Sequence, residues 1–162
     1  MQTKIITERL LLNILTQGDH DFIRELVNTE GWLQFIGDRN IHSEEAAIAY
    51  INKINGTPNF YYWVVRLKEN HRPVGIITFI KRDYFTYFDI GFAFLPDYNG
   101  KGYAYEAANE VLSFIKLQPQ LQTVLATTLP GNVRSINLLA RLGFHFDREI
   151  VVGNNLLCVY ST

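Results

Sequence analysis

The loop at residues 95–107, LPDYNGKGYAYEA, gathers the residues of this chain that are best suited to bind an anion. Gly100 and Gly102 flank Lys101, and apolar residues spaced by three and four from Ala104 to Ile115 predict a helix that begins beside Gly102. The first N–H groups of a helix have no partner within it, so they attract an anion together with the helix dipole. Glycines let a phosphate approach the backbone, and Lys101 adds positive charge. These residues predict a phosphate-binding turn, and an ordinary Asn-Gly turn with a lysine in solvent remains the alternative.

Two common phosphate loops do not fit this stretch. A Walker A loop needs a glycine where Leu95 stands, and the dinucleotide fingerprint needs a third glycine at Tyr105. If the loop binds phosphate, it does so by another scheme.

The rest of the chain predicts the elements that must position this loop. Helical stripes occur at residues 18–29, 43–54, from about 102 to 117, and 132–143, the last ending at Gly143. Strand patterns occur at residues 8–15, 60–67, 74–82, 87–95, 122–128, 145–152 and 156–161. Three successive strands followed by helical crossovers predict an α/β (α+β) fold, with a mixed, largely antiparallel central sheet of about seven strands flanked by four helices. We expect a single domain over residues 1–162.

Composition excludes several classes of protein. Hydrophobic residues make up 48% of the 162, charged residues 19%, and the formal net charge is −1, which indicates a globular protein without a broad basic surface for nucleic acid. The single cysteine, Cys158, rules out a disulfide within the chain. Glu8 and Arg9 interrupt the apolar stretch near the N-terminus, and no apolar run reaches the ~20 residues that span a bilayer. We therefore expect a cytoplasmic protein that uses neither a membrane nor nucleic acid as a partner.

The stretch YNGKGYAYEA resembles the acetyl-CoA pyrophosphate loop of the GNAT superfamily of N-acetyltransferases, in which a Gln or Arg is followed at fixed spacing by Gly and then Gly or Ala. Asn99 stands at the first place, Gly102 at the fourth and Ala104 at the sixth; Asn99 departs from the usual residue, which matters little if backbone N–H groups bind the phosphates. The segments DIGFAFLPDY and NVRSINLLARLGF resemble the family's fourth strand and its asparagine-bearing helix. The resemblance covers nearly the whole chain and is strongest to the branch of ribosomal-protein N-terminal (Rim-type) acetyltransferases.

The resemblance implies a set of residues that bind acetyl-CoA. In the family a bulge parts the fourth strand from its neighbour and frees backbone groups for the pantetheine arm. The implied binding residues lie on that strand, in the loop and at the start of the last helix: Phe92, Ala93, Phe94, Asn99, Gly100, Lys101, Gly102, Tyr103, Ala104 and Asn132. Asn132 would also serve as the N-cap of its helix, and the sequence leaves both roles open. Arg134 and Arg141 could meet the 3′-phosphate or lie in solvent.

Acetyl transfer needs a neutral amine, a donor for the developing oxyanion, and a proton for the departing thiolate. The resemblance implies Ser135 as the general acid, with an ordinary first-turn serine as the alternative. Many relatives use a tyrosine seven residues after the asparagine, but Leu139 stands there, and Tyr103 and Tyr105 are weaker substitutes. Asp89 is the first candidate base and Glu106 the second, each with a structural role as the alternative.

Relatives build the acceptor pocket between the first two helices and in the loop that contains Tyr84. The implied acceptor residues are Trp32, Phe35, Asp38 and Tyr84, where aromatics beside an acid would suit a cationic amine. The acceptor itself stays open: a protein N-terminus, a polyamine, an amino acid or an antibiotic. The four histidines lie on separate elements without metal-ligand spacing, so no metal is expected.

The sequence therefore predicts an acetyl-CoA-dependent N-acetyltransferase that acts on a primary amine, as a monomer or homodimer. A non-catalytic CoA-binding or regulatory module of the same fold is the alternative, and Leu139 at the tyrosine position keeps it open.

Overall fold

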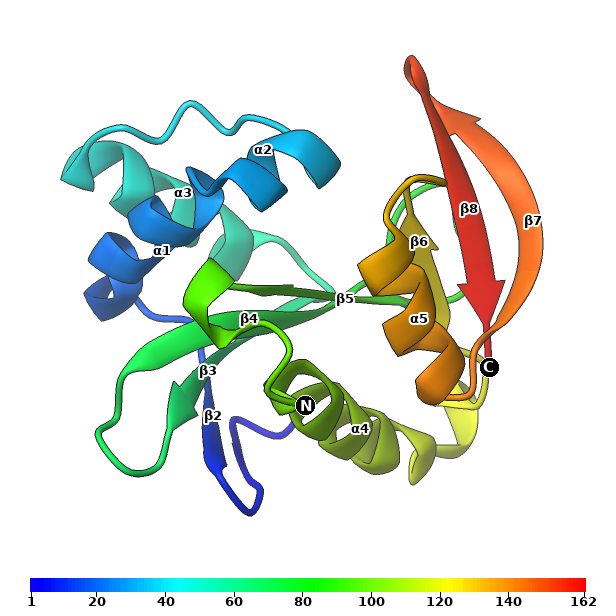
Figure 1. The fold of residues 1–162 in the computed structure, drawn as a ribbon, viewed down its shortest axis with the longest axis horizontal. Coiled ribbons are helices and arrows are strands. Elements are labelled where there is room, and N and C mark those ends of the chain that lie inside the picture. Colours follow the sequence, from blue (N-terminus) through cyan, green and yellow to red (C-terminus); the bar gives the residue numbers. More distant parts are fainter.

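The protein folds around one sheet of eight strands, in the order β1-β2-β3-β4-β5-β6-β8-β7 (Figure 1). The computed structural model describes residues 1–162. The strands are β1 (Lys4–Ile6), β2 (Leu10–Ile14), β3 (Phe60–Leu67), β4 (Pro73–Ile80), β5 (Asp89–Phe94), β6 (Leu125–Thr128), β7 (His145–Val152) and β8 (Asn155–Ser161). The α-helices are α1 (His20–Val27), α2 (Glu30–Phe35), α3 (Glu44–Gly56), α4 (Tyr103–Lys116) and α5 (Val133–Arg141), and short 3₁₀ turns form η1 (Gln17–Asp19), η2 (Pro96–Tyr98) and η3 (Pro119–Leu121).

The predicted mixed, largely antiparallel sheet is confirmed. Every pair of neighbouring strands is antiparallel except β5 and β6, which are parallel. The structure adds two short elements to the predicted seven strands and four helices. They are β1, which pairs with β2 across a tight turn, and α2, which occupies part of the segment predicted to lie between the first two helices.

Helices cover both faces of the sheet, which explains why β3 and β4 are apolar at nearly every position. On β3, Trp63 and Val65 face a core that includes α4 and α5, whereas Val64 faces a second core that includes α1 and α3. In Figure 1, α1 to α3 gather over one side of the sheet and α4 runs beneath its centre. The sheet is therefore packed between two layers of helices.

Local signals set the ends of the helices that flank the site. Gly102, with φ of 82°, is the N-cap of α4, as the loop predicted. Gly143, with φ of 84°, follows the end of α5 and confirms the predicted left-handed cap. No helix of the chain combines the length and the apolar character that a membrane crossing requires.

Candidate active site

A cleft opens where β5 and β6 part. These two parallel strands meet only through Asp89 and Leu125, and β6 otherwise pairs with β8 along Leu125–Thr128. The edge of β5 from Gly91 to Phe94 that faces β6 therefore has no strand partner. The pairing of β4 with β5 continues without a register shift, so the strands separate without the bulge that the family resemblance implied.

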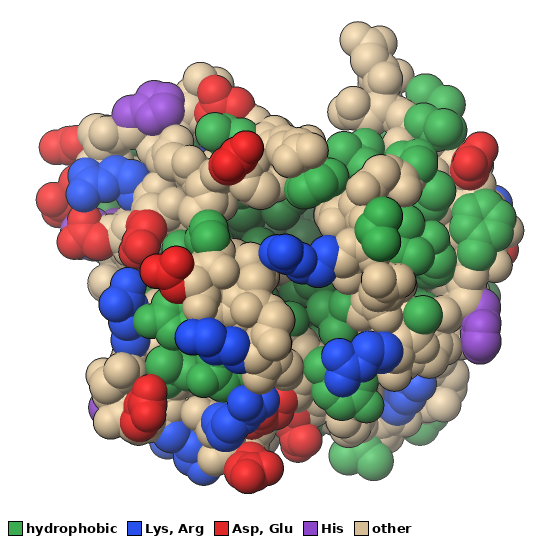
Figure 2. Space-filling model, in the orientation of Figure 1, with side chains coloured by type: hydrophobic (Ala, Val, Ile, Leu, Met, Phe, Trp, Pro, Cys, Tyr) green, Lys and Arg blue, Asp and Glu red, His purple; other side chains and the backbone are tan.

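The cleft has a volume of about 1470 Å³ and runs between the two halves of the sheet. Figure 2 shows a recess in this position whose floor is largely hydrophobic and whose opening carries a basic side chain. Of the residues that the sequence assigned to the donor, the cleft is lined by Phe92, Ala93, Phe94, Asn99, Gly100, Gly102, Tyr103, Ala104 and Asn132. Lys101 alone does not line it. Its ammonium group lies over the Tyr98 ring, 5.3 Å from the centroid.

The start of α4 borders the cleft, which Gly102, Tyr103 and Ala104 line. No side chain caps this helix, because its N-cap is Gly102 in the left-handed region. Gly100 also has a positive φ, of 74°. The loop is thus a backbone cradle without side chains at its two sharpest points, which fits a pyrophosphate group.

Asn132 and Ser135 form the opposite wall, at the start of α5. The Asn132 Oδ1 accepts a hydrogen bond from the Ser135 backbone N–H at 3.2 Å, so the predicted N-cap role is present. The amide –NH₂ of Asn132 stays available to a ligand, and both residues line the cleft. The cap and a ligand contact are therefore compatible. Leu139, at the tyrosine position of many relatives, is fully buried in the core and cannot serve as a proton donor.

Asp89 lies at the floor of the cleft, where β5 and β6 meet. Its carboxylate is 3% exposed, and its two oxygens share the single N–H that the Arg82 Nε donates, at 3.0 and 2.9 Å. Burial raises the pKa of the Asp89 carboxyl, and the Arg82 guanidinium only partly opposes this. A raised pKa suits a base. However, the Arg82 guanidinium already occupies one side of the carboxylate.

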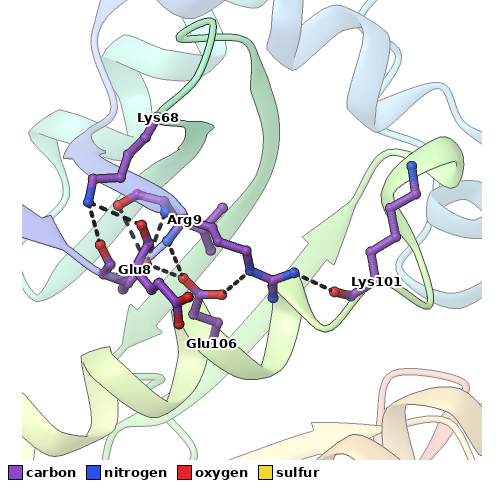
Figure 3. Close-up of polar contacts among 7 residues, drawn as sticks. Glu8, Arg9, Lys68, Lys101 and Glu106 are labelled. Carbon is purple, nitrogen blue, oxygen red and sulfur yellow. Dashed lines mark hydrogen bonds and ion pairs between the residues drawn. The ribbon is translucent and has the colours of Figure 1, made fainter.

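Glu106, the second candidate base, does not line the cleft. It accepts hydrogen bonds from the Thr7 Oγ1 at 2.5 Å, from the Arg9 backbone N–H at 2.8 Å and from the Arg9 Nε at 2.7 Å (Figure 3). Burial alone would raise the pKa of the Glu106 carboxyl, but these three donors outweigh it and hold the pKa below its ordinary value. Glu106 therefore ties α4 to the β1–β2 turn. No local pattern indicates this contact, because Thr7 and Arg9 lie 99 and 97 residues away from Glu106 in the chain.

The acceptor end of the cleft contains three of the four residues that were expected there. Trp32, Phe35 and Tyr84 line it, although Trp32 is also buried in the core under α1 and α3. Asp38 does not reach the cleft. Its side chain is turned to the surface, where Oδ1 accepts a hydrogen bond from the Asn40 backbone N–H at 2.7 Å.

Sequence reasoning missed several residues of this end of the cleft. Tyr50, Lys53, Tyr62 and Arg82 all line it, as does Arg39, which stands in the segment expected to build the acceptor pocket. Burial raises the pKa of the Tyr62 hydroxyl further above neutral pH, and the hydroxyl can serve as a hydrogen-bond donor. The helical stripe of residues 43–54 located Tyr50 on an apolar face, but nothing local indicates which face overlooks the cleft.

Elsewhere in the chain, no group of three or more His, Cys, Asp or Glu side chains is placed to hold a metal ion. Arg141, at the end of α5, stacks over the Tyr105 ring at 4.6 Å and links α5 to the first turn of α4. This contact connects α4 and α5, which form the two walls of the cleft where acetyl-CoA is expected.

Comparisons with known proteins agree with this geometry. The family model described as an acetyltransferase (GNAT) domain matches residues 9–145. An uncharacterized N-acetyltransferase of Bacillus subtilis, YnaD, is 30% identical over 154 residues, which cover 93% of this chain and 89% of the relative. The ribosomal protein uS5-alanine N-acetyltransferase of Escherichia coli is 26% identical over 102 residues, which cover 62% of this chain and 53% of that enzyme. Among solved structures, a GNAT-family acetyltransferase from Bacillus anthracis superposes with a TM-score of 0.82 at 26% identity, covering 98% of this chain and 97% of the other.

Proposed function

Because the chain belongs to the GNAT acetyltransferase family, we propose that it transfers the acetyl group of acetyl-CoA directly to a primary amine. One observation carries the proposal furthest: β5 has no strand partner on the β6 side after Asp89, and the chain that continues from β5 forms the glycine loop and the uncapped N-terminus of α4. The free edge of β5 can pair with the amides of a pantetheine arm, while the loop at residues 99–102 can receive the pyrophosphate. A single domain over residues 1–162 would then hold the whole site.

The reaction requires few groups from the protein. The amine nitrogen adds to the carbonyl carbon, whose oxygen becomes an oxyanion, and the carbon–sulfur bond then breaks as this adduct collapses; the amine loses a proton and the sulfur gains one. Unpaired N–H groups on β5 are placed to stabilise the oxyanion that forms on the way. Ser135 is the candidate proton donor to the sulfur, and its place beside Asn132 puts it next to the expected arm.

The amine must also lose a proton to a base, for which Asp89 is the candidate. Asp89 has the burial and raised pKa that suit a base, but Arg82 must leave or share the carboxylate before Asp89 can accept a proton. An α-amine with a pKa near ~8 needs less help than a side-chain amine near ~10.4. An acceptor that presents an α-amine therefore fits this site better than a lysine.

The charged residues at the acceptor end of the cleft narrow the chemical class of the acceptor further. Arg39, Lys53 and Arg82 line it, against Glu30 and Asp89, and the Arg82–Asp89 ion pair removes one charge of each sign. The basic residues are thus in excess, and the expected acid Asp38 is absent from the lining. This arrangement disfavours polycations such as polyamines and aminoglycosides. We propose an α-amine whose own molecule carries a carboxylate, as in an amino acid or an acidic peptide.

A transfer assay with paired acceptors tests the acceptor class. Each amino acid is compared with its amide, which keeps the amine and loses the carboxylate, and spermidine and kanamycin represent the polycations. We expect a higher kcat/KM for each amino acid than for its amide. The ratio of these two kcat/KM values should fall several-fold in Arg39→Gln and in Lys53→Gln, but not in the control Lys116→Gln. Preferred turnover of spermidine would refute this acceptor class while leaving acetyl transfer intact.

The non-catalytic module remains the second candidate, because Leu139 closes the usual tyrosine route. A thermal melt with acetyl-CoA, with ADP as the comparison ligand, addresses binding first. A ligand at ~100 times its dissociation constant adds ~2.7 kcal/mol of stability. A clear stabilisation without turnover of any amine or of water would favour the module, and no stabilisation at millimolar acetyl-CoA would refute both candidates.

A further inference from the structure

Arg9, which the sequence presented only as a charge in an apolar stretch, connects three parts of the molecule. It lies in the turn between β1 and β2, and its Nε pairs with Glu106 on α4. Its Nη1 donates a hydrogen bond to the backbone carbonyl of Lys101 at 3.0 Å, and its guanidinium stacks over the Tyr103 ring at 4.5 Å. Figure 3 shows the Lys101 carbonyl turned toward Arg9 while the Lys101 side chain extends away.

The hydrogen bond to Lys101 has a geometric consequence for the next residue. In a planar trans peptide the C=O and N–H groups point in opposite directions. Because Arg9 draws the Lys101 carbonyl toward the β1–β2 turn, the Gly102 N–H is directed away from that turn. Gly102 lines the cleft, so its N–H becomes one of the donors that the loop presents to a ligand.

Nothing local would hold this peptide in place without Arg9. Gly100 and Gly102 both adopt positive φ, and glycine crosses between conformations at little steric cost. No side chain caps the start of α4. A 101–102 peptide between two such glycines can rotate and point its carbonyl, instead of its N–H, at an anion.

Glu106 in turn fixes Arg9. Three donors from the β1–β2 turn converge on its carboxylate, and Lys68 Nζ bonds the carbonyls of Thr7 and Glu8 at 2.8 and 3.1 Å, which anchors the turn to β3 and its following loop. The Arg9 side chain is 44% exposed, so the ion pair by itself contributes little to folding. We therefore look for the role of this network in the backbone group that Arg9 orients, the Lys101 carbonyl.

We propose that Arg9 is a positioning residue for the pyrophosphate of the donor: it holds the 101–102 peptide so that the Gly102 N–H faces the phosphates. The inference rests on the proposed function for the identity of the ligand. It assigns the role to a residue that lies 92 positions from Lys101 in the chain and does not line the cleft.

The test compares two acetyl donors that share the pantetheine arm. S-acetylpantetheine lacks the pyrophosphate that acetyl-CoA carries. In Arg9→Met, the ratio of kcat/KM for acetyl-CoA to that for S-acetylpantetheine should fall roughly 10- to 100-fold, as expected when a hydrogen bond to a charged group is misdirected. Arg24→Met is the matched control, because Arg24 is a half-exposed arginine paired with Asp21 on α1.

A second readout follows the ligand-free loop. The Gly102 amide resonance should shift and broaden in Arg9→Met but not in Arg24→Met, and inorganic pyrophosphate should move it in the wild type much more than in Arg9→Met. An equal loss with both donors would mean that Arg9 only supports folding, and an unchanged ratio would mean that it does not orient the loop; either overturns the inference. If the wild type used neither donor, the proposed function would fail, and the pyrophosphate titration would still decide the role of Arg9.

Discussion

Asp89 on β5 and Leu125 on β6 form the one residue pair through which these parallel strands meet. The pair stands at the first residue of both strands, and beyond it β5 runs on with an edge that pairs with no strand, while β6 pairs with β8. The same residue pair therefore joins the two halves of the sheet and marks the bottom of the cleft. The position of the site follows from this single interruption in the pairing.

Gly102→Ala should raise KM for acetyl-CoA about tenfold with little change in kcat. An alanine at φ of 82° costs about 1 kcal/mol, and its Cβ would lie 3.2 Å from the Arg9 Nη2. Gly143→Ala is the control, since Gly143 has φ of 84° and open space around the new Cβ. Steady-state kinetics and thermal melts should show a similar loss of stability in both variants but a raised KM only in Gly102→Ala. A raised KM in both would point to a global effect.

Asn132→Asp separates the two roles of this residue. Aspartate keeps the oxygen that caps α5 and loses the –NH₂ that could donate to the pantetheine arm. We expect KM for acetyl-CoA to rise about tenfold with stability nearly unchanged. Asn132→Ala should show the same KM defect and lose about 1 kcal/mol of stability as well. A wild-type KM in Asn132→Asp would leave Asn132 with the cap alone.

Ser135→Ala tests the proposed general acid. Loss of a proton donor should lower kcat by about 10²-fold or more while KM for acetyl-CoA and the melting temperature stay close to wild type. Ser113→Ala, which removes an exposed helical hydroxyl bonded to the Asn109 carbonyl, provides the control. A wild-type kcat in Ser135→Ala would assign the proton transfer to another group or to solvent.

Arg82→Gln should be more destabilising than Asp89→Asn. The first change leaves a buried carboxylate without its partner, whereas the second leaves an arginine that is already 35% exposed and can turn to solvent. We expect a loss of about 2 to 3 kcal/mol for Arg82→Gln in denaturant unfolding, lower than for a fully buried pair because of that exposure. If Asp89 is also the base, Asp89→Asn will lower kcat and remove the acidic limb of its pH profile; an unchanged profile would leave Asp89 with a structural role.

Acidification should weaken the contact between α4 and the β1–β2 turn. The pKa of Glu106 is lower in the folded protein than its ordinary value of 4.5, so the stability that it contributes is complete above about pH 4.5 and is lost as pH falls through the folded-state pKa. The difference in melting temperature between wild type and Glu106→Gln should therefore be constant near neutral pH and shrink as the pH is lowered below about 4.5. A difference that grew on acidification would contradict this assignment.

Most of the elements were predictable from local patterns. The three-and-four spacing from Ala104 to Ile115 predicted α4, and five residues of that stripe are buried as expected: Ala107, Ala108, Val111, Leu112 and Ile115. Gly102 and Gly143 marked helix ends for the same reason, because positive φ favours glycine wherever it occurs. Short elements such as β1 and α2 were missed, since three to six residues carry too little periodicity to be recognised.

The acceptor end shows where local patterns stop being informative. Asp38 and Arg39 are adjacent in the chain, yet Arg39 lines the cleft and Asp38 turns outward to the Asn40 N–H. Side-chain direction in an irregular segment depends on the turn that the whole segment adopts, which no spacing rule predicts. The acceptor end of the cleft, which was expected to contain an acidic residue at position 38, therefore contains the basic Arg39 instead.

The sequence by itself determined the order of the elements, the glycine loop at the start of α4 and the asparagine at the start of α5, because turn chemistry and periodicity act over a few residues. Only the tertiary structure decided that β5 and β6 part after Asp89, that Arg82 covers the Asp89 carboxylate, and that Arg9 reaches a carbonyl 92 residues away. These contacts depend on how packed layers bring distant segments together, and a linear pattern carries no information about which distant partner a side chain will meet.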